Sequence, residues 1–232
     1  MLLDLIMRKS LLKFLYLAVV VLFFAGCSKD DNSKPIDFRR DYYPLEIGNE
    51  WIYDVQEINK TLSKDDTLNF QLKESINGLL SDSNGERLYS IYRYSRINES
   101  DPWNLDSVWT LVSNERYIVK RENNIGFQKL IFPLTENSSW DGNIWNSLAP
   151  QTFSIEYVDS SAEINGNEYN ETLYVDELDN VNLLLSQKQH EIYARNIGLV
   201  EYYKEDLETQ PGEKTLGSIY TQRLVSVNFK DF

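Results

Sequence analysis

Few residues in this sequence could carry out chemistry on a substrate. His190 is the only histidine, so a histidine-rich zinc site is excluded and a catalytic triad would have a single base. Acidic residues occur in pairs, such as Asp65-Asp66 and Glu205-Asp206. Two carboxylates can hydrolyse a glycosidic bond only when they face each other across a cleft, roughly 5–10 Å apart. Adjacency in the sequence does not provide that geometry, so we predict no catalytic residue and no enzymatic activity.

One acidic segment contains oxygen ligands of the kind that calcium prefers. Asp176, Glu177 and Asp179 lie close together in the sequence and could offer carboxylates from one loop. The segment lacks the ligand spacing and the glycine of a recognised calcium loop. We therefore regard it as a weak calcium hypothesis and expect neither a metal nor another cofactor.

Three tryptophans are the strongest prediction for ligand contact. Trp103, Trp140 and Trp145 lie near Asp, Asn, Gly and Ser residues. A flat ring beside carboxylates and carboxamides suits a carbohydrate, because the ring covers the apolar face of the sugar and the polar groups bind its hydroxyls. The alternative is that these rings fill the core of a curved sheet. The sequence favours this core role, and ligand stacking stays the second hypothesis.

The N-terminal segment predicts export and attachment to a membrane. Three basic residues between positions 8 and 13 precede the apolar run FLYLAVVVLFFA, whether the chain starts at Met1 or Met7. A run of about 12 residues is too short to span a bilayer and fits the core of an export signal. Its end, Phe24-Ala25-Gly26-Cys27, resembles the lipobox of bacterial lipoproteins. That resemblance implies that residues 1–26 are a signal peptide, and that lipid is added to Cys27. Acyl chains on this residue would then hold the protein at the membrane.

The residues after Cys27 bear on localisation. Ser28, Lys29, Asp30 and Asp31 look like the surface-export signal of Bacteroidetes lipoproteins. This resemblance implies display on the cell surface at the outer membrane, with a periplasm-facing outer-membrane lipoprotein as the alternative. Residues 27–41 are polar and contain a proline, so we expect a flexible tether behind the lipidated cysteine.

Composition limits the class of protein and of partner. The chain has 232 residues, a formal net charge of −13, and 42% hydrophobic and 13% aromatic residues. This length can bury a large core without disulfides. The acidic balance argues against nucleic acid, whose phosphates require clustered Lys and Arg. We expect one domain over residues 42–232.

The elements that must position these residues have the pattern of strands. In Glu50–Ile58, Trp51, Tyr53 and Val55 alternate with polar residues, which is the period of a half-buried strand. Asn165-Gly166 predicts a tight hairpin because both positions favour positive φ. We predict an all-β protein: a curved antiparallel sheet, meander or half-open β-barrel with little helix beyond the signal peptide. Val181–Gln189 is the best helical candidate, with a buried strand as the alternative.

Two further Asn-Gly pairs, Asn77-Gly78 and Asn84-Gly85, predict a looser connection between them. Tyr43-Pro44-Leu45 and Phe132-Pro133-Leu134 each precede a tryptophan, Trp51 and Trp140, which indicates a weak internal repeat. Each proline would end strand pairing ahead of a turn.

The same segments carry a family resemblance. YYPLEIGNEWIYDV, IFPLTENSSWDG and YARNIGLVEYYKE are similar to a loose group of uncharacterised Bacteroidetes lipoproteins, and this resemblance implies an antiparallel β domain without a catalytic residue. Our leading hypothesis is a non-enzymatic binding or scaffold lipoprotein that contacts a glycan, a lipid or a partner protein. One alternative is a carrier that holds a hydrophobic ligand on the concave side of its sheet. The other is a carboxylate-based hydrolase.

Overall fold

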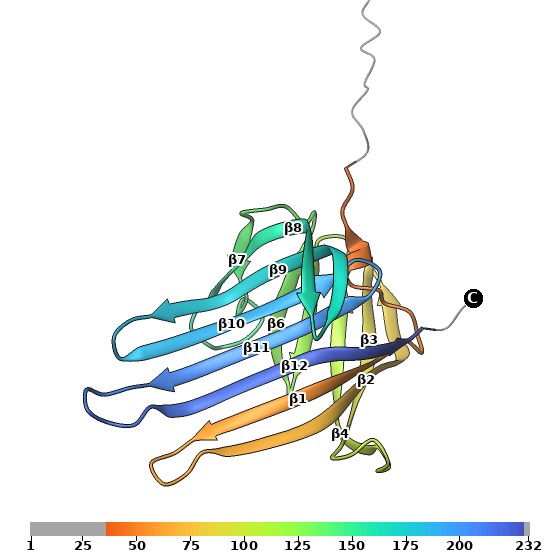
Figure 1. Cartoon of the computed structure of the whole chain (residues 1–232). Coiled ribbons are helices and arrows are strands. Elements are labelled where there is room, and N and C mark those ends of the chain that lie inside the picture. Colours follow the sequence, from red (N-terminus) through yellow and green to blue (C-terminus); the bar gives the residue numbers. More distant parts are fainter. Residues whose placement is uncertain (1–35, 230–232) are drawn as a thin grey trace, which may run out of the picture. The chain divides into compact units, whose positions relative to one another are not determined.

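The computed structural model describes residues 36–229, which form almost wholly antiparallel β-structure (Figure 1). Twelve strands make one sheet in the order β6-β5-β4-β3-β2-β1-β12-β11-β10-β9-β8-β7. The strands are β1 (Glu50–Lys60), β2 (Asp66–Ser83), β3 (Glu86–Arg96), β4 (Asn104–Ser113), β5 (Tyr117–Glu122), β6 (Ile125–Ile131), β7 (Ser139–Asp141), β8 (Thr152–Ile164), β9 (Asn167–Val181), β10 (Leu185–Ala194), β11 (Gly198–Glu208) and β12 (Leu216–Asn228). The predicted all-β class is confirmed, and no helix within residues 36–229 is long and apolar enough to cross a bilayer.

The sheet is a meander that joins its first strand to its last. Strands β1 and β12 pair antiparallel, from Glu50 opposite Asn228 to Lys60 opposite Gly217. This pairing leaves β6 and β7 at the two ends of the strand order. The two ends approach each other, because the backbone N–H of Gln128 in β6 donates to the carbonyl of Gly142, just after β7, at 2.9 Å. The result is a nearly closed, barrel-like sheet.

The compact unit begins earlier than the sequence indicated. It starts at Asp37, and the short 3-10 turn η1 spans Arg40–Tyr42. The guanidinium of Arg39 lies 2.8 Å from the carboxylate of Asp159. Tyr42 is fully buried and donates its hydroxyl to the same Asp159 at 2.8 Å. Residues 37–41 therefore pack against the sheet, although their polarity predicted a tether up to residue 41.

The tight turns follow the Asn-Gly pairs in two of three cases. Asn165-Gly166 joins β8 to β9 with φ values of 52° and 76°, which confirms the predicted hairpin. Asn84-Gly85 joins β2 to β3 with φ values of 55° and 79°. Asn77-Gly78, in contrast, lies within β2, where the register against β3 shifts. The expectation of a loose connection between the two pairs was wrong, because glycine here accommodates a bulge rather than a turn.

The helical prediction for Val181–Gln189 was also wrong, and the segment is not a buried strand either, because Val181 and Leu184 are exposed. Val181 ends β9 and Leu185 begins β10, so the segment is a hairpin. The side-chain oxygen of Asn182 accepts hydrogen bonds from the backbone N–H groups of Leu184 and Leu185, at 2.9 and 3.0 Å. An asparagine that bonds to the backbone ahead of it favours a turn over a helix. Leu183, at the tip, is 97% exposed.

The predicted internal repeat is present in the structure as two copies of one turn. In the first copy, residues 44–51, the backbone N–H of Asn49 donates to the carbonyl of Glu46 at 3.1 Å. The N–H of Gly48 donates to the carbonyl of Ile76 at 2.7 Å, and the N–H of Ile76 donates back to the carbonyl of Asn49 at 3.0 Å. Gly48 has a φ of 94°, which suits glycine.

The second copy, residues 133–140, repeats these bonds. The N–H of Ser138 donates to the carbonyl of Thr135 at 3.1 Å. The N–H of Asn137 donates to the carbonyl of Ile155 at 2.8 Å, and Ile155 donates back to Ser138 at 2.9 Å. Asn137 takes the place of the glycine, with a φ of 62°, because asparagine tolerates this region better than other side chains.

Each turn delivers a tryptophan into the interior. The indole of Trp51 donates to the carbonyl of Ile197 at 2.6 Å, and the indole of Trp140 donates to the carbonyl of Gln128 at 2.7 Å. Both rings are buried. The indole N–H is thus satisfied while the ring fills apolar space, as a buried tryptophan requires.

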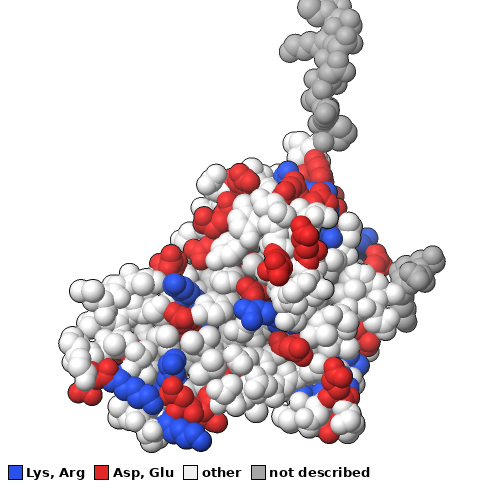
Figure 2. All heavy atoms as spheres, viewed as in Figure 1, with Lys and Arg blue, Asp and Glu red and all other residues white. Residues whose placement is uncertain are grey.

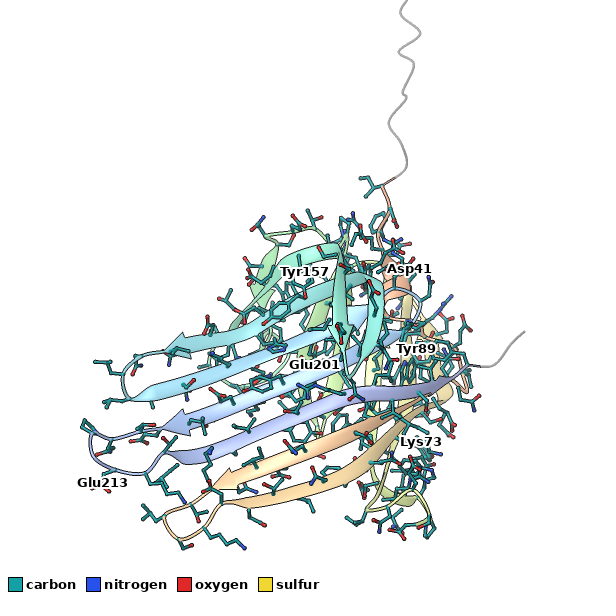
Figure 3. The ribbon with its side chains drawn as sticks, viewed as in Figure 1. Asp41, Lys73, Tyr89, Tyr157, Glu201 and Glu213 are labelled. Atoms are coloured by element: carbon teal, nitrogen blue, oxygen red, sulfur yellow. The ribbon has the colours of Figure 1, made fainter. Side chains whose placement is uncertain are left out.

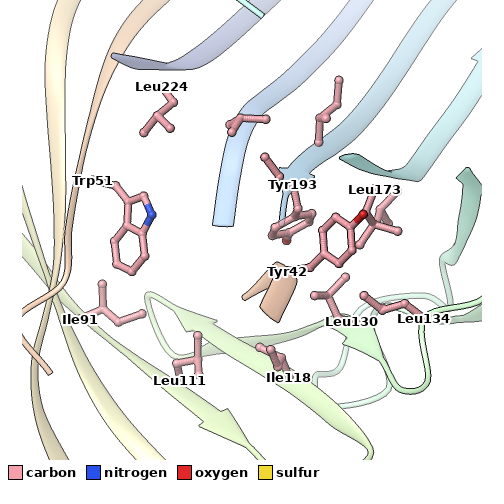
Figure 4. Close-up of a cluster of buried hydrophobic side chains, with 14 of the residues drawn as sticks. Tyr42, Trp51, Ile91, Leu111, Ile118, Leu130, Leu134, Leu173, Tyr193 and Leu224 are labelled. Atoms are coloured by element: carbon pink, nitrogen blue, oxygen red, sulfur yellow. The ribbon is translucent and has the colours of Figure 1, made fainter. Parts of the chain in front are cut away.

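The interior contains one apolar cluster lined by alternate residues of the strands. Trp51, Ile91, Leu111, Leu173 and Leu224 come from five different strands and converge on it (Figure 4). Burial of such side chains stabilises the fold by about 1.5–3 kcal/mol each. The same inward face also carries ionised groups, in two clusters.

The first cluster places one carboxylate between two cations. Lys120 of β5 lies 3.0 Å from the carboxylate of Glu74 in β2, and Arg93 of β3 lies 3.1 Å from it. The ring of Trp109 lies under both cations, 3.7 Å from the Arg93 guanidinium and 4.9 Å from the Lys120 ammonium. Burial acts to raise the pKa of Glu74, but Lys120 and Arg93 lower it below its usual value. We call this set the Lys120 cluster.

The second cluster reverses these signs. Lys129 of β6 lies 2.6 Å from the carboxylate of Glu177 in β9 and 2.7 Å from that of Glu191 in β10. Burial, and then the nearby Glu191, raise the pKa of Glu177 to about 7. Burial acts to lower the pKa of Lys129, but the two carboxylates raise it well above its usual value. We call this set the Lys129 cluster.

Candidate functional site

Four aromatic rings from four neighbouring strands form a row on the outward face of the sheet. They are Tyr157 of β8, Tyr174 of β9, His190 of β10 and Tyr203 of β11. Their ring centroids lie 5.4, 4.8 and 5.2 Å apart in that order. The two contacts of His190 are stacked, with interplanar angles of 24° and 22°. We call this set the aromatic row.

The strand period explains why the row faces outward. Leu173 and Val175, the neighbours of Tyr174, are fully buried in the core. Successive side chains in a strand point to opposite faces, so Tyr174 lies on the outer face, where it is half-buried. Cross-strand pairing then brings the rings together, and such aromatic pairs stabilise a sheet by roughly 0.2–1 kcal/mol each.

The row lies along an open groove of about 660 Å³. Carboxylates of Glu156, Asp176 and Asp179 line the groove, together with the ammonium of Lys188. Within residues 36–229 none of these four groups forms an ion pair. Tyr174, His190 and Tyr203 stack on one another. The groove thus offers aromatic side chains together with charged groups that have no ion-pair partner.

The pKa values in the groove reflect uncompensated negative charge. Burial, followed by repulsion from Glu156 and Asp179, raises the pKa of Asp176 above its usual value. Burial and the charge of Asp176 raise the pKa of Tyr174 to about 12. Burial and a hydrogen bond to Glu205 raise the pKa of Tyr203 to about 12. Both tyrosines therefore keep their hydroxyl protons near neutral pH.

His190 is held by polar contacts as well as by its stacked neighbours. Its Nε2 lies 3.2 Å from Oε1 of Glu201, and Arg223 donates to Oε2 of the same carboxylate at 2.6 Å. Figure 3 labels Glu201, which belongs to β11, and Tyr157, which belongs to β8. No serine, threonine or cysteine hydroxyl or thiol within residues 36–229 is hydrogen-bonded to His190. The geometry favours a positioning role for this histidine over that of a general base.

The three predicted tryptophans have three different environments. Trp140 is 8% exposed and packs edge-on against Phe153, so it belongs to the core. Trp103 is half-buried beneath Lys73 and Arg96, whose charged groups lie 5.3 and 4.2 Å from its ring. Trp145 is 43% exposed. The structure does not bring the three together in one site.

The three acidic residues proposed to bind calcium do not face one common site. Glu177 is fully buried on Lys129, whereas Asp176 and Asp179 line the outer groove. Neighbouring residues of a strand point to opposite faces, so Asp176 and Glu177 cannot face the same ion. Within residues 36–229 no group of three or more His, Cys, Asp or Glu side chains could hold a metal ion.

The predicted lipidation site and export signal lie outside the described residues. Cys27 and the segment Ser28, Lys29, Asp30 and Asp31 belong to residues 1–35. The lipid anchor and the surface-export signal therefore stay predictions from the sequence.

The two alternative functions meet different obstacles. An enclosed cavity between the ionic clusters, lined in part by Glu74 and Glu191, has a volume of about 20 Å³. That is room for one water molecule and not for a lipid, so the described interior does not support a carrier. Glu177 and Glu191 share the cation of Lys129, and both are buried in the core. A hydrolase would have to use acids outside this core.

Sequence reasoning missed the aromatic row. One sequence pattern could have indicated it: an acidic residue lies two positions from each of Tyr157, Tyr174 and Tyr203. Their strands also contain register shifts, next to Tyr157 and next to His190. Counting alternate residues therefore could not align the four rings.

Comparisons with known proteins add little to this geometry. No family model and no curated protein sequence matches the chain. A crystal structure of a candidate lipoprotein from Parabacteroides distasonis is similar over 83% of this chain and 100% of its own, with 10% identity and a TM-score of 0.41. A candidate outer membrane lipoprotein-sorting protein domain from Vibrio parahaemolyticus covers 83% of this chain and 89% of its own, with 9% identity and a TM-score of 0.22. At these values neither likeness supports an argument about function.

Proposed function

We propose that the protein is a lipid-anchored, non-enzymatic binding module, and that the groove along the aromatic row binds a glycan. The observation that carries the proposal is the row itself. Four half-buried rings stand beside three carboxylates in an open groove of about 660 Å³. Ligand sites commonly have volumes of about 300–1,000 Å³ and combine aromatic walls with a few polar groups.

The chemistry of the groove matches a ligand rich in hydroxyl groups. Free carboxylates accept hydrogen bonds from sugar hydroxyls, and hydrogen bonds to charged groups contribute about 1.5–3 kcal/mol. Tyrosine hydroxyls both donate and accept, and the high pKa values of Tyr174 and Tyr203 keep them protonated. On the face drawn in Figure 2, acidic and basic side chains are interspersed, whereas a nucleic-acid site needs clustered basic residues.

The anchor follows from the sequence. The lipobox-like end of the apolar run supports cleavage before Cys27 and lipidation of its thiol, and the acidic segment after it supports display at the outer membrane, facing outward. Mass spectrometry of the native protein would test the anchor: we expect a chain that starts at Cys27 with acyl groups attached. Protease treatment of intact cells would separate outward display from a periplasm-facing arrangement.

Binding can be tested on the full-length lipoprotein in a zwitterionic detergent that carries no sugar. We expect binding to members of a glycan array, followed by isothermal titration with the best of them. Asp176→Asn should weaken binding roughly tenfold, because it replaces a charged acceptor by a neutral amide. Glu213→Gln is the matched control, because Glu213 is exposed in the β11–β12 turn, away from the groove lining.

The outcomes separate the competing functions. Equal binding by the wild type, D176N and E213Q would place the glycan elsewhere and overturn the proposal for the row. Cleavage of the glycan, detected as new reducing ends and lost in D176N, would instead assign a hydrolase to the groove.

A further inference from the structure

A second groove, away from the aromatic row, begins at Trp145. A hollow of about 60 Å³ is lined by Trp145, Tyr117 and Val119. It shares Glu86, Val112 and Arg121 with a groove of about 480 Å³ that continues along the β2–β3 hairpin. We call the two hollows together the Trp145 groove.

Trp145 is fixed in place although it lies at the surface. Its indole donates to the side-chain oxygen of Gln128 at 2.8 Å, and the next residue, Asn146, donates to the carbonyl of Gly126 at 2.9 Å. A Cβ at Gly126 would lie 3.2 Å from both the Cβ and the carbonyl oxygen of Trp145. Glycine at position 126 therefore allows the loop to approach β6 this closely. The ring is positioned before any ligand arrives, which lowers the entropic cost of binding.

The exposure of this ring is unusual among the tryptophans. Trp51, Trp109 and Trp140 are at most 8% exposed, whereas Trp145 is 43% exposed. The ring of Tyr117 lies 5.3 Å from it at an angle of 47°. A rigid and exposed indole beside a second ring offers a flat apolar surface to a ligand.

Glu86, Arg87 and Arg121 are the charged residues that line this groove. Arg87 pairs with Asp82 at 3.3 Å, so Arg121 and Glu86 are the two lining charges without an ion pair within residues 36–229. Arg121 is exposed and forms no ion pair or side-chain hydrogen bond within residues 36–229. Glu86 accepts from the hydroxyl of Tyr117 at 2.5 Å and from Asn114 at 3.3 Å. Its carboxylate is thus already hydrogen-bonded by neutral donors. In a protein with a formal net charge of −13, an unpaired arginine beside an exposed tryptophan indicates an anionic ligand.

We propose that the Trp145 groove binds a sugar that carries a carboxylate. The planar guanidinium of Arg121 matches a carboxylate with two parallel hydrogen bonds. The indole would cover the apolar face of the sugar ring, and the hydroxyls of Ser81, Ser83 and Thr110 line the rest of the groove. This site differs from the aromatic row, where three carboxylates and one ammonium group line the groove, and the inference does not depend on the function proposed for the row.

The probe is trigalacturonate, with its fully methyl-esterified form as the uncharged counterpart. We expect the full-length lipoprotein in zwitterionic detergent to bind the acid at least tenfold more tightly than the ester, since one charge-assisted pair accounts for a factor of this size. Binding should change tryptophan fluorescence, and Trp145→Phe should remove that change. Arg121→Ala should lower affinity for the acid at least tenfold and leave affinity for the ester unchanged.

Controls keep failure to fold apart from failure to bind. Lys64→Ala removes one exposed positive charge from the β1–β2 turn and should bind like the wild type. Thermal unfolding of R121A should match that of K64A. Equal affinity for acid and ester, unchanged binding by R121A, or no binding of trigalacturonate at millimolar concentration would each overturn the assignment. D176N should leave this binding intact, so failure here is distinguishable from failure of the aromatic row.

Discussion

The Lys120 cluster and the Lys129 cluster are buried to a similar degree but carry opposite excess charge. Lys129 serves two carboxylates, and the surplus negative charge is relieved by a proton, because the pKa of Glu177 is raised to about 7. Glu74 serves two cations, and arginine does not release its proton. There the surplus positive charge rests on the face of Trp109, which attracts cations. A buried excess of carboxylates can thus be neutralised by a proton, whereas a buried excess of cations is stabilised by contact with an aromatic ring.

Lys129→Met should have the largest effect on this comparison. It leaves Glu177 and Glu191 in the core without a cation, and breaking a buried ion pair typically costs about 3–5 kcal/mol. Urea unfolding at pH 8 should show a loss of this size, and the loss should shrink at pH 5, where the carboxyl groups can take up protons. Lys204→Met, at an exposed position on β11, should change stability by less than about 0.5 kcal/mol. A loss in K129M that does not depend on pH would contradict the role of the proton.

The proton on Glu177 predicts a stability profile. Its folded pKa of about 7 lies above its usual value of 4.5. Its contribution is therefore fully present below about pH 4.5 and is lost as the pH rises through about 7. The upper limit is about 3 kcal/mol. Glu177→Gln should flatten the difference in unfolding free energy between pH 5 and pH 8, measured against Glu213→Gln. An unchanged profile in E177Q would show that Glu177 is ionised throughout.

Lys120→Met should cost less than Lys129→Met. Glu74 keeps Arg93 as a partner at 3.1 Å, so no carboxylate is left without a cation. We expect a loss of about 1–3 kcal/mol, the cost of an unsatisfied buried hydrogen-bonding group. In contrast to K129M, acidification to pH 5 should bring little recovery. A larger loss than in K129M under the same urea unfolding would invert the comparison.

The smallest expected effect belongs to Arg93→Lys. The charge on Glu74 stays balanced as before, but the planar contact with Trp109 at 3.7 Å is lost. A cation–π contact contributes about 0.5–2 kcal/mol, so we expect a loss near 1 kcal/mol in thermal unfolding. Arg93→Met, which also removes the charge, should lose distinctly more. Equal losses in the two variants would show that the ring contributes nothing to holding the cation excess.

These clusters also show what the sequence could and could not predict. Alternation correctly placed Trp51, Tyr53 and Val55 on one face of β1, and the structure buries all three. In β3 both alternating sets contain tyrosines, so the pattern did not say which set faces inward. The inward set is the one with Arg93, and its partner Glu74 comes from another strand.

A turn could be predicted from the sequence where its conformation depends on only a few adjacent residues. Asn165-Gly166 formed its hairpin because both residues adopt positive φ without help from elsewhere. The partner of Lys129 at Glu177 lies 48 residues away, and the aromatic row requires four strands in register. Such contacts depend on how strands pair across the whole sheet, and the sequence of a single strand does not contain that information.

The pairing of β1 with β12 bears on how the newly made chain reaches its final form. Glu50 and Asn228, hydrogen-bonded across this pair, are 178 positions apart. Synthesis from the N-terminus delivers β1 long before its second neighbour, so one side of β1 has open backbone groups in the meantime. Open edges of this kind recruit other chains, and contacts between distant segments slow folding. A chaperone that shields β1 until the final segment emerges would protect the nascent protein when it is most prone to aggregate.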